Sequence, residues 1–265
     1  MKSIYRAVII ASLCIGYLIA DSIAPTNIGV VVMHGKGGMP SKHVAEFAQR
    51  LEAKGYHVAN LEMPWSKQRE YDVSMEGAQK ELELAFHHLR AKGAQKLFLS
   101  GHSQGGLVAL VLGSSLKVDG IIAIAPGGNV GSPIYKEKIS EALSRAQQMV
   151  NEGRGDEKAE FYDFESAKGR YAIQTSAQNY LSWFSPDGKM NQEKSSVLID
   201  AKIPVLFIVP TADYPGLLKV KQKMFELLPK NVHTRLYEPN ATHLEAPSAS
   251  IEEVSMWMQS VVEGR

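Results

Sequence analysis

From residue 27 onward, short runs of apolar, often β-branched residues alternate with longer stretches of helical periodicity. The first run, NIGVVVMHG (27–35), is continuously apolar, as expected for a strand buried on both faces of a parallel sheet. Five further strands are expected at 56–63, 96–100, 120–126, 204–210 and 233–239. Helices are expected at 41–55, with Ser41 as its cap, and at 76–92, 104–116, 215–229 and 246–263. This alternation predicts an α/β fold, with a mostly parallel sheet of about six strands and helices on both faces.

One interval, residues 127–200, interrupts the alternation. It is polar, has helical patterning and contains no convincing strand. We therefore interpret it as a helical lid inserted into a single α/β domain that spans residues 25–265. The insertion carries an aromatic segment, NYLSWF, that includes Trp183 and Phe184. These rings either form the insertion's own small core or line a substrate pocket, and in the second case Trp183 and Phe184 are the candidate substrate contacts.

The composition limits the classes of partner. The chain has 265 residues, 45% of them hydrophobic, which suits one sizeable globular domain. Its formal net charge is only +1, and no run of Lys or Arg stands out that would neutralise a line of phosphates. Nucleic acid is therefore not an expected partner.

The amino terminus has the layout of a secretory signal. Lys2 and Arg6 precede an uncharged apolar stretch, residues 7–20, and Asp21 restores polarity. Residues 1–20 are therefore predicted to be a signal peptide, which implies a periplasmic or secreted protein. Leu18 stands where cleavage prefers a small residue, so the alternative is an uncleaved N-terminal anchor, the only membrane attachment we expect. The single cysteine, Cys14, lies in this segment, so no disulfide is expected.

The segment LFLSGHSQGGLVALVLG (97–113) joins a predicted strand to a predicted helix through a turn that holds Ser103. A side chain at Gly101 or Gly105 would collide with the adjoining strand or helix in such a turn. The turn thus presents the serine hydroxyl at the carboxyl edge of the sheet and at a helix amino terminus, which favours developing negative charge. Ser103 is the predicted nucleophile.

A serine hydroxyl needs a base and an acid that orients the base. His243 is the candidate base, because the loop between the last strand and the last helix opens at the same sheet edge as Ser103. Asp213 follows the strand at 204–210 and is the candidate acid, although a turn residue before the next helix would look the same. The other histidines fit surface, packing or loop positions, and His102 is expected to line or pack beside the serine turn. Other acids are placed less well: Asp119, Asp200, Asp187 and Glu245.

The glycine-rich loop MHGKGGMP (33–40) follows the first strand and allows close approach of the backbone to a substrate. Its Lys36 N–H and the Gln104 N–H are the predicted donors to an oxyanion. A phosphate-binding glycine loop is the rival interpretation, but the loop matches neither of the usual phosphate motifs. No metal and no cofactor is expected.

The order Ser103, Asp213, His243, together with the HG loop and the insertion before the acid-bearing strand, resembles the α/β-hydrolase superfamily over nearly all of residues 27–263. The resemblance implies an acyl-enzyme mechanism and a small-molecule substrate, with carboxylic esters as the leading hypothesis. Amidase, peptidase or thioesterase activity on the same triad is the alternative. A binding protein that kept the fold but lost catalysis is the hypothesis from another class. Two antiparallel strands of the full superfamily pattern have no room after the signal, so a trimmed sheet is expected.

Overall fold

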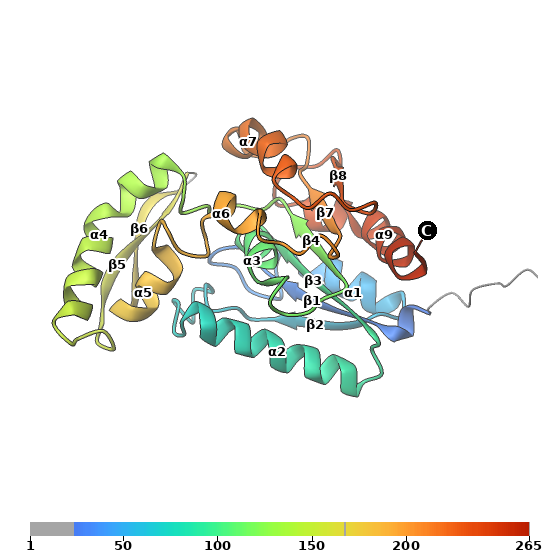
Figure 1. Ribbon diagram of the computed structural model, residues 1–265, viewed down its shortest axis with the longest axis horizontal. Helices are drawn as coiled ribbons and strands as arrows, with labels where there is room; N and C mark the ends of the chain where they lie inside the picture. Colours follow the sequence, from blue (N-terminus) through green and yellow to red (C-terminus); the bar gives the residue numbers. More distant parts are fainter. Residues whose placement is uncertain (1–23, 167, 265) are drawn as a thin grey trace, which may run out of the picture.

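The computed structural model describes residues 24–166 and 168–264, and the predicted signal peptide lies outside these residues. A six-stranded sheet in the order β2-β1-β3-β4-β7-β8 forms the centre of the molecule, and every neighbouring pair is parallel (Figure 1). Its strands are β1 (Ile28–Met33), β2 (His57–Leu61), β3 (Lys96–His102), β4 (Gly120–Ile124), β7 (Val205–Ile208) and β8 (Arg235–Tyr237). The six predicted strands and the α/β fold class are confirmed.

Helices cover both faces of this sheet, because the strands are apolar on both sides. In β1, Val31 and Met33 join one core cluster, whereas Val30 and Val32 join the other. The first cluster includes residues of α2 (Met75–Ala91), α3 (Gln104–Leu112) and α7 (Pro215–Glu226). The second includes residues of α1 (Ala45–Ala53), α8 (Ala246–Ala249) and α9 (Ile251–Glu263). None of the helices in residues 24–166 and 168–264 has the length and apolar character needed to cross a membrane.

Two predicted helices differ in detail. The first begins at Ala45 rather than after Ser41, and Val44 is its N-cap, without a side-chain cap. Ser41 lies in turns instead, closed by hydrogen bonds from Lys42 N to Met39 O and from Ala45 N to Lys42 O. The last helix is divided into α8 and α9 at Ser250, whose hydroxyl donates to Ala246 O at 2.7 Å.

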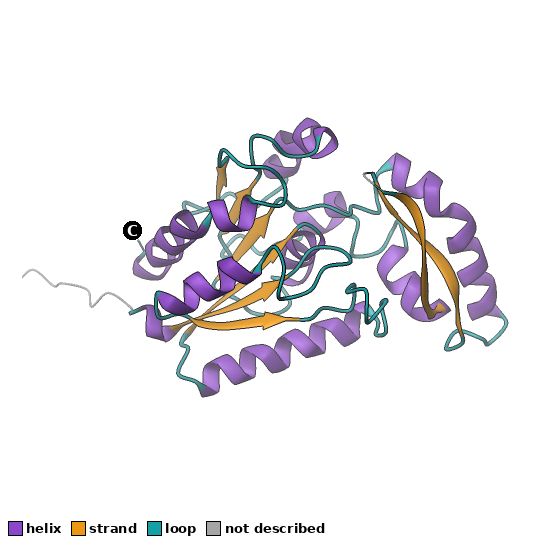
Figure 2. Cartoon of the chain, turned by 180° about the vertical axis from the view of Figure 1, so that it is seen from behind, coloured by secondary structure: helices purple, strands orange, loops and turns teal. Residues whose placement is uncertain are grey.

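The insertion is not purely helical, which corrects the prediction of a helical lid. It comprises α4 (Pro133–Asn151), β5 (Lys158–Glu165), β6 (Gly169–Ser176), α5 (Ala177–Phe184) and α6 (Gln192–Ser196). Strands β5 and β6 pair in an antiparallel hairpin that packs with α4 and α5 in a lobe beside the sheet (Figure 2). Polar residues interrupt both strands, so neither shows the continuous apolar run that marks the strands of the sheet.

Candidate active site

Ser103 occupies a strained turn between β3 and α3. Its backbone has φ 54° and ψ −116°, a left-handed conformation that is rare outside glycine and is typical of functional positions. A Cβ at Gly101 would lie 2.3 Å from the carbonyl carbon and oxygen of Gly105, and one at Gly105 would lie 2.7 Å from Met33 O. Only glycine fits at these two positions, as the sequence predicted. The turn leaves Ser103 half-buried at the carboxyl edge of the sheet.

His243 and Asp213 meet at this edge, although 30 residues separate them. The loops that follow β7 and β8 are joined by a hydrogen bond from Ala212 N to Ala241 O at 3.1 Å. His243 Nδ1 donates to Asp213 Oδ1 at 2.6 Å, and both residues are buried. Because the Nδ1 proton is engaged, Nε2 is the nitrogen left to accept a proton. The Tyr214 ring covers the imidazole, with 4.5 Å between centroids.

The serine turn packs against the loop that carries His243. His102 Nε2 donates to His243 O at 2.9 Å, and the two rings lie 4.8 Å apart. Among the residues that the structure describes, Ser103 Oγ makes no hydrogen bond, to His243 or to any other group. Catalytic hydrogen bonds are often long or poorly aligned in the absence of substrate. The structure therefore pairs the predicted base with the predicted acid and brings the loop of the base against the predicted nucleophile's turn.

His102 is a neutral buried histidine rather than a second base. Burial, and to a smaller extent the neighbouring His243, lowers the pKa of His102 to about 3. A carbonyl oxygen only accepts hydrogen bonds, so the contact with His243 O fixes the proton of His102 on Nε2. Its Nδ1 is buried and has no partner within the described chain. The packing role predicted for His102 agrees with this environment.

The loop after β1 is held by its own histidine and by the loop after β2. His34 Nδ1 donates to Gly35 O at 2.7 Å, and His34 Nε2 accepts from Met63 N at 3.0 Å. Gly37 N donates to Trp65 O at 2.9 Å. Burial lowers the pKa of His34, which keeps it neutral for these two contacts.

This arrangement leaves two backbone donors free beside the serine. A Cβ at Gly35 would lie 3.2 Å from Ser103 Cβ, so the loop runs against the turn. In the described part of the chain, Lys36 N–H has no acceptor. Gln104 is the first residue of α3, and its N–H has no partner within the helix. These are the two groups predicted to bind an oxyanion, and both are unpaired and near the nucleophile's turn.

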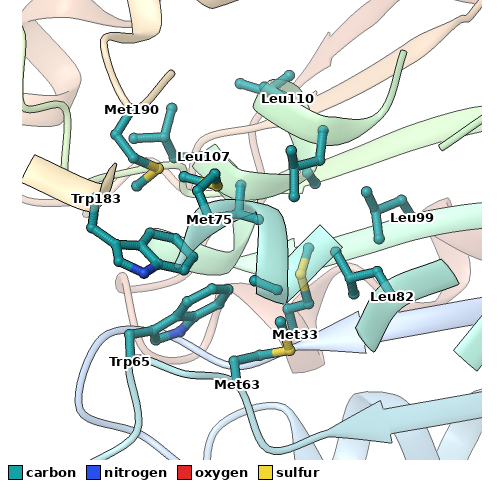
Figure 3. Close-up of a cluster of buried hydrophobic side chains, with 14 of the residues drawn as sticks. Met33, Met63, Trp65, Met75, Leu82, Leu99, Leu107, Leu110, Trp183 and Met190 are labelled. Carbon is teal, nitrogen blue, oxygen red and sulfur yellow. The ribbon is translucent and has the colours of Figure 1, made fainter. Parts of the chain in front are cut away.

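Trp183 and Phe184 lie in a core instead of on an open surface. Their exposed fractions are 1% and 2%. Trp183 packs edge-on against Trp65, as Figure 3 shows, and donates Nε1–H to Val73 O at 2.8 Å. Phe184 stacks on Tyr180. Covered rings cannot contact a substrate, so this arrangement does not support the substrate-binding role predicted for the two residues and favours the alternative role in a core.

A charged cluster that the sequence did not indicate lies between the glycine-rich loop and the insertion. Lys36 Nζ lies 2.7 Å from Asp163 Oδ1, and Asp163 is fully buried in β5. The tyrosines around this aspartate come from three separate elements. A lone acidic residue two positions after buried Phe161, on the buried side of a strand, is a signal for such a cluster. It was missed because no strand was predicted at β5.

The sheet is parallel, and the serine turn, the glycine-rich loop and the His–Asp pair lie at its carboxyl edge. Together with the family match given below, this arrangement identifies the class of protein. The protein is an α/β hydrolase, an enzyme class in which one fold hosts many substrates. It belongs to the family described as serine aminopeptidase, S33, whose model matches residues 25–161, just over half of the chain.

Solved structures of other proteins, two of them lipases, share the fold. The chain is 21% identical to a monoacylglycerol lipase from Paleococcus ferrophilus, with a TM-score of 0.61 over 88% of this chain and 94% of that one. DcsB, solved with a substrate analogue, is 17% identical, with a TM-score of 0.64 over 90% and 92%. A monoglyceride lipase from Saccharomyces cerevisiae is 14% identical, with a TM-score of 0.58 over 89% and 87%. None of the curated proteins compared with the chain matches it significantly.

Proposed function

We propose that the protein hydrolyses carboxylic esters through an acyl-enzyme intermediate. Ser103 Oγ attacks the acyl carbon, and His243 Nε2 takes the hydroxyl proton and returns it to the leaving alkoxide. Water then cleaves the acyl-enzyme by the same proton transfers. Asp213 fixes the tautomer of His243, and the N–H groups of Lys36 and Gln104 bind the oxyanion.

One observation carries this proposal: a half-buried serine in a strained turn lies beside two unpaired N–H groups and the loop of a hydrogen-bonded His–Asp pair. Strain at a half-buried serine whose hydroxyl makes no hydrogen bond within the described chain has no evident structural benefit, so it points to function. The same set of groups is what acyl transfer requires of a protein, namely a nucleophile, an oriented base and donors for the developing charge.

Apolar side chains around Ser103 favour a substrate with a hydrocarbon acyl group. A Cβ at Gly127 would lie 3.7 Å from both Ser103 Oγ and Leu217 Cδ1, so Leu217 and the nucleophile both border Gly127. Tyr214 and Leu244 flank the acid and the base in sequence, and about half of each side chain is exposed (44% and 45%). Burial of these surfaces by a substrate would contribute to its binding.

Ester chemistry is favoured over aminopeptidase chemistry by the carboxylates. An aminopeptidase must bind a free ammonium group, for which a carboxylate is the natural partner. Among the described residues, the buried carboxylates are those of Asp163 and Asp213. Asp163 is taken by Lys36 and tyrosine hydroxyls, whereas Asp213 binds His243 through Oδ1 and its Oδ2 is buried away from solvent. Neither is available to a peptide amino terminus.

A substrate panel tests this proposal. Nitrophenyl esters of increasing chain length are compared with thioesters, amino-acid anilides and short peptides, and a fluorophosphonate probe is applied to the same enzyme. We expect ester turnover, higher for hydrocarbon acyl chains than for acetate, and labelling at Ser103. Faster cleavage of anilides or peptides than of any ester would reject the ester assignment. Absence of both labelling and turnover in folded protein would favour a binding protein of the same fold.

We also propose an extracytoplasmic location, on the basis of the predicted signal at residues 1–20. Cell fractionation with sequencing of the mature amino terminus tests it. Cleavage near Ala20 would support secretion, whereas retention of the full chain in the membrane fraction would support an anchor. Recovery of the full chain from the cytoplasm would contradict both.

A further inference from the structure

The buried carboxylate of Asp163 receives hydrogen bonds from several parts of the chain. Its Oδ1 accepts from Lys36 Nζ at 2.7 Å, from Phe164 N at 2.6 Å, and from the Tyr135 hydroxyl. Its Oδ2 accepts from the hydroxyls of Tyr71 and Tyr171, each at 2.9 Å. Asp163 has no exposed surface, and the Lys36 side chain is only 8% exposed. This is more hydrogen bonding than the anchoring of one hairpin strand requires.

Hydrogen bonds connect this carboxylate to both residues that are predicted to bind the oxyanion. On one side, its partner Lys36 is itself the donor residue of the glycine-rich loop, and Lys36 Nζ also donates to Tyr135 and to Phe164 O. On the other side, the Tyr71 hydroxyl lies 3.2 Å from Gln104 Oε1, so its proton is shared between Asp163 and Gln104. One acidic residue of the insertion therefore holds the side chains of both residues whose N–H groups face the reaction.

Tyr71 is strained in a way that fits this link. Its φ is 59°, in the left-handed region that disfavours a bulky side chain, and the preceding Glu70 has φ 45°. The insertion holds this conformation, because Tyr71 O accepts from Thr175 Oγ1 at 2.7 Å and from Asn179 Nδ2 at 3.1 Å. Such strain persists where the surroundings fix it, and it occurs where position matters for function.

Burial keeps the tyrosines in their donating form. It raises the pKa of Tyr71 and of Tyr135 well above the ordinary value, and the negative charge of Asp163 raises both further. Their hydroxyls therefore stay protonated and donate to the carboxylate throughout the working range of pH. The hydrogen bonds that Tyr71 and Tyr135 donate to Asp163 are therefore not lost through ionisation of the tyrosines.

We propose that Asp163 is a positioning residue that fixes the oxyanion hole, through Lys36 on one side and through Tyr71 and Gln104 on the other. The inference rests on the proposed function of Ser103. Preorganised donors lower the barrier because they need no reorganisation when charge develops. An Asp163 variant keeps both N–H groups but holds them less rigidly. The variant should therefore lose stabilisation of the transition state, whereas its affinity for the substrate should change little.

The test is Asp163→Asn in the full-length enzyme, with Glu160→Gln as the control. Both changes remove one negative charge from β5, but Glu160 is exposed. For Asp163→Asn we expect kcat on a nitrophenyl ester to fall by about 10- to 100-fold, less than the 10²–10³-fold typical when a donor is removed altogether. We expect KM to change by less than about threefold, as for an interaction made only in the transition state. Glu160→Gln should keep both constants within about twofold of wild type, as an exposed change should.

Inhibitors separate positioning from a general loss of structure. A trifluoromethyl ketone forms an oxyanion with Ser103, whereas the corresponding alcohol binds without one. Asp163→Asn should weaken the ketone by the same factor as kcat/KM and leave the alcohol unchanged within about twofold. Equal weakening of both inhibitors, or an unchanged ketone affinity, would overturn the inference.

Two further variants cover the case in which Asp163→Asn does not fold. Tyr71→Phe keeps the ring and removes the hydroxyl between Asp163 and Gln104, and we expect a fall in kcat of about 5- to 10-fold, since one of two tethers is lost. Lys36→Met removes the ammonium but keeps the backbone N–H, and we expect a fall in kcat of about 5- to 10-fold for the same reason, because the other of the two tethers is lost. Wild-type rates in both Tyr71→Phe and Lys36→Met would overturn the role of Asp163 and leave the proposed ester hydrolysis standing. If the wild-type enzyme showed neither labelling nor ester turnover, the proposed function and the role of Asp163 would both be overturned.

Discussion

The sheet and the insertion bury their strands in different ways, and this difference separates the scaffold from the tuning of the site. The central strands of the sheet are covered on both faces, so β1 and β4 are buried at every position. In the hairpin of the insertion, β6 alternates exposed residues with half-buried or buried ones, and β5 buries Asp163 beside Phe161 and Phe164. Turns and loops at the carboxyl edge of the sheet carry the proposed nucleophile, base and acid. The insertion supplies a polar contact that reaches the glycine-rich loop.

The largest expected effect concerns the sheet. Ser103→Ala should lower ester turnover by about 10⁶-fold if Ser103, His243 and Asp213 act as a unit. Steady-state kinetics with an active-site titration measures this loss. For the same reason, adding His243→Ala to Ser103→Ala should cost little more. Near-normal turnover in the single variant would place the chemistry elsewhere, and the insertion would then be the next region to search.

Two glycine substitutions compare the tolerance of the two regions. Gly101→Ala places a Cβ 2.3 Å from the Gly105 backbone, and we expect it to lower the free energy of unfolding by about 4 kcal/mol or more. Gly153, which follows α4, has φ 77° and no atom within 4 Å of such a Cβ, so Gly153→Ala should cost only about 1–2 kcal/mol. Urea denaturation measures both. Similar losses would mean that the serine turn is less constrained than its geometry indicates.

The same difference explains which features the sequence predicted. Continuous apolar runs identify strands buried on both faces, so the six strands of the sheet and the loops at their ends were found. Asp213 and His243 were inferred to lie at the same edge as Ser103 because each follows the carboxyl end of a predicted strand. The hairpin was missed because Lys158, Glu160 and Arg170 break its apolar pattern. Without β5 there was no way to see that Asp163 points inward toward Lys36. Contacts between distant elements depend on packing that local patterns do not encode.

The pH dependence of stability offers a third comparison. The pKa of His102 is about 3 in the folded protein, below its ordinary value of 6.5, because the ring is buried. The unfolded chain therefore takes up a proton below about pH 6.5 while the folded chain does not, so this group makes stability fall as the pH drops from about 6.5 toward 3. His102→Gln retains a donor for His243 O and cannot titrate. Its free energy of unfolding should decline with falling pH less steeply than that of wild type, by up to about 1.4 kcal/mol per pH unit.

Denaturation series between pH 7 and pH 4 measure these slopes. The matched control is His87→Gln in α2, which changes an exposed histidine and should leave the slope as in wild type. Equal slopes in wild type and His102→Gln would contradict a neutral buried His102.

A smaller effect than that of Gly101→Ala is expected where the two regions join. Trp183 belongs to the insertion but packs against Trp65, which follows β2, and its indole N–H donates to Val73 O, which precedes α2. Trp183→Phe keeps an aromatic ring and leaves that carbonyl without its donor, which should lower the free energy of unfolding by about 1–3 kcal/mol. Leu198→Ala, at a side chain that is 76% exposed, should change the free energy of unfolding by less than about 0.5 kcal/mol.

Chemical denaturation followed by tryptophan fluorescence and by circular dichroism measures both variants. If the junction couples the two regions, Trp183→Phe lowers the stability of the whole protein and the two signals still change together. In this variant Trp65, which packs against position 183, reports on the junction. A separate, earlier fluorescence transition would therefore mean that the insertion detaches or unfolds on its own, and its contacts with Lys36 and Tyr71 would then be too weak to fix the oxyanion hole.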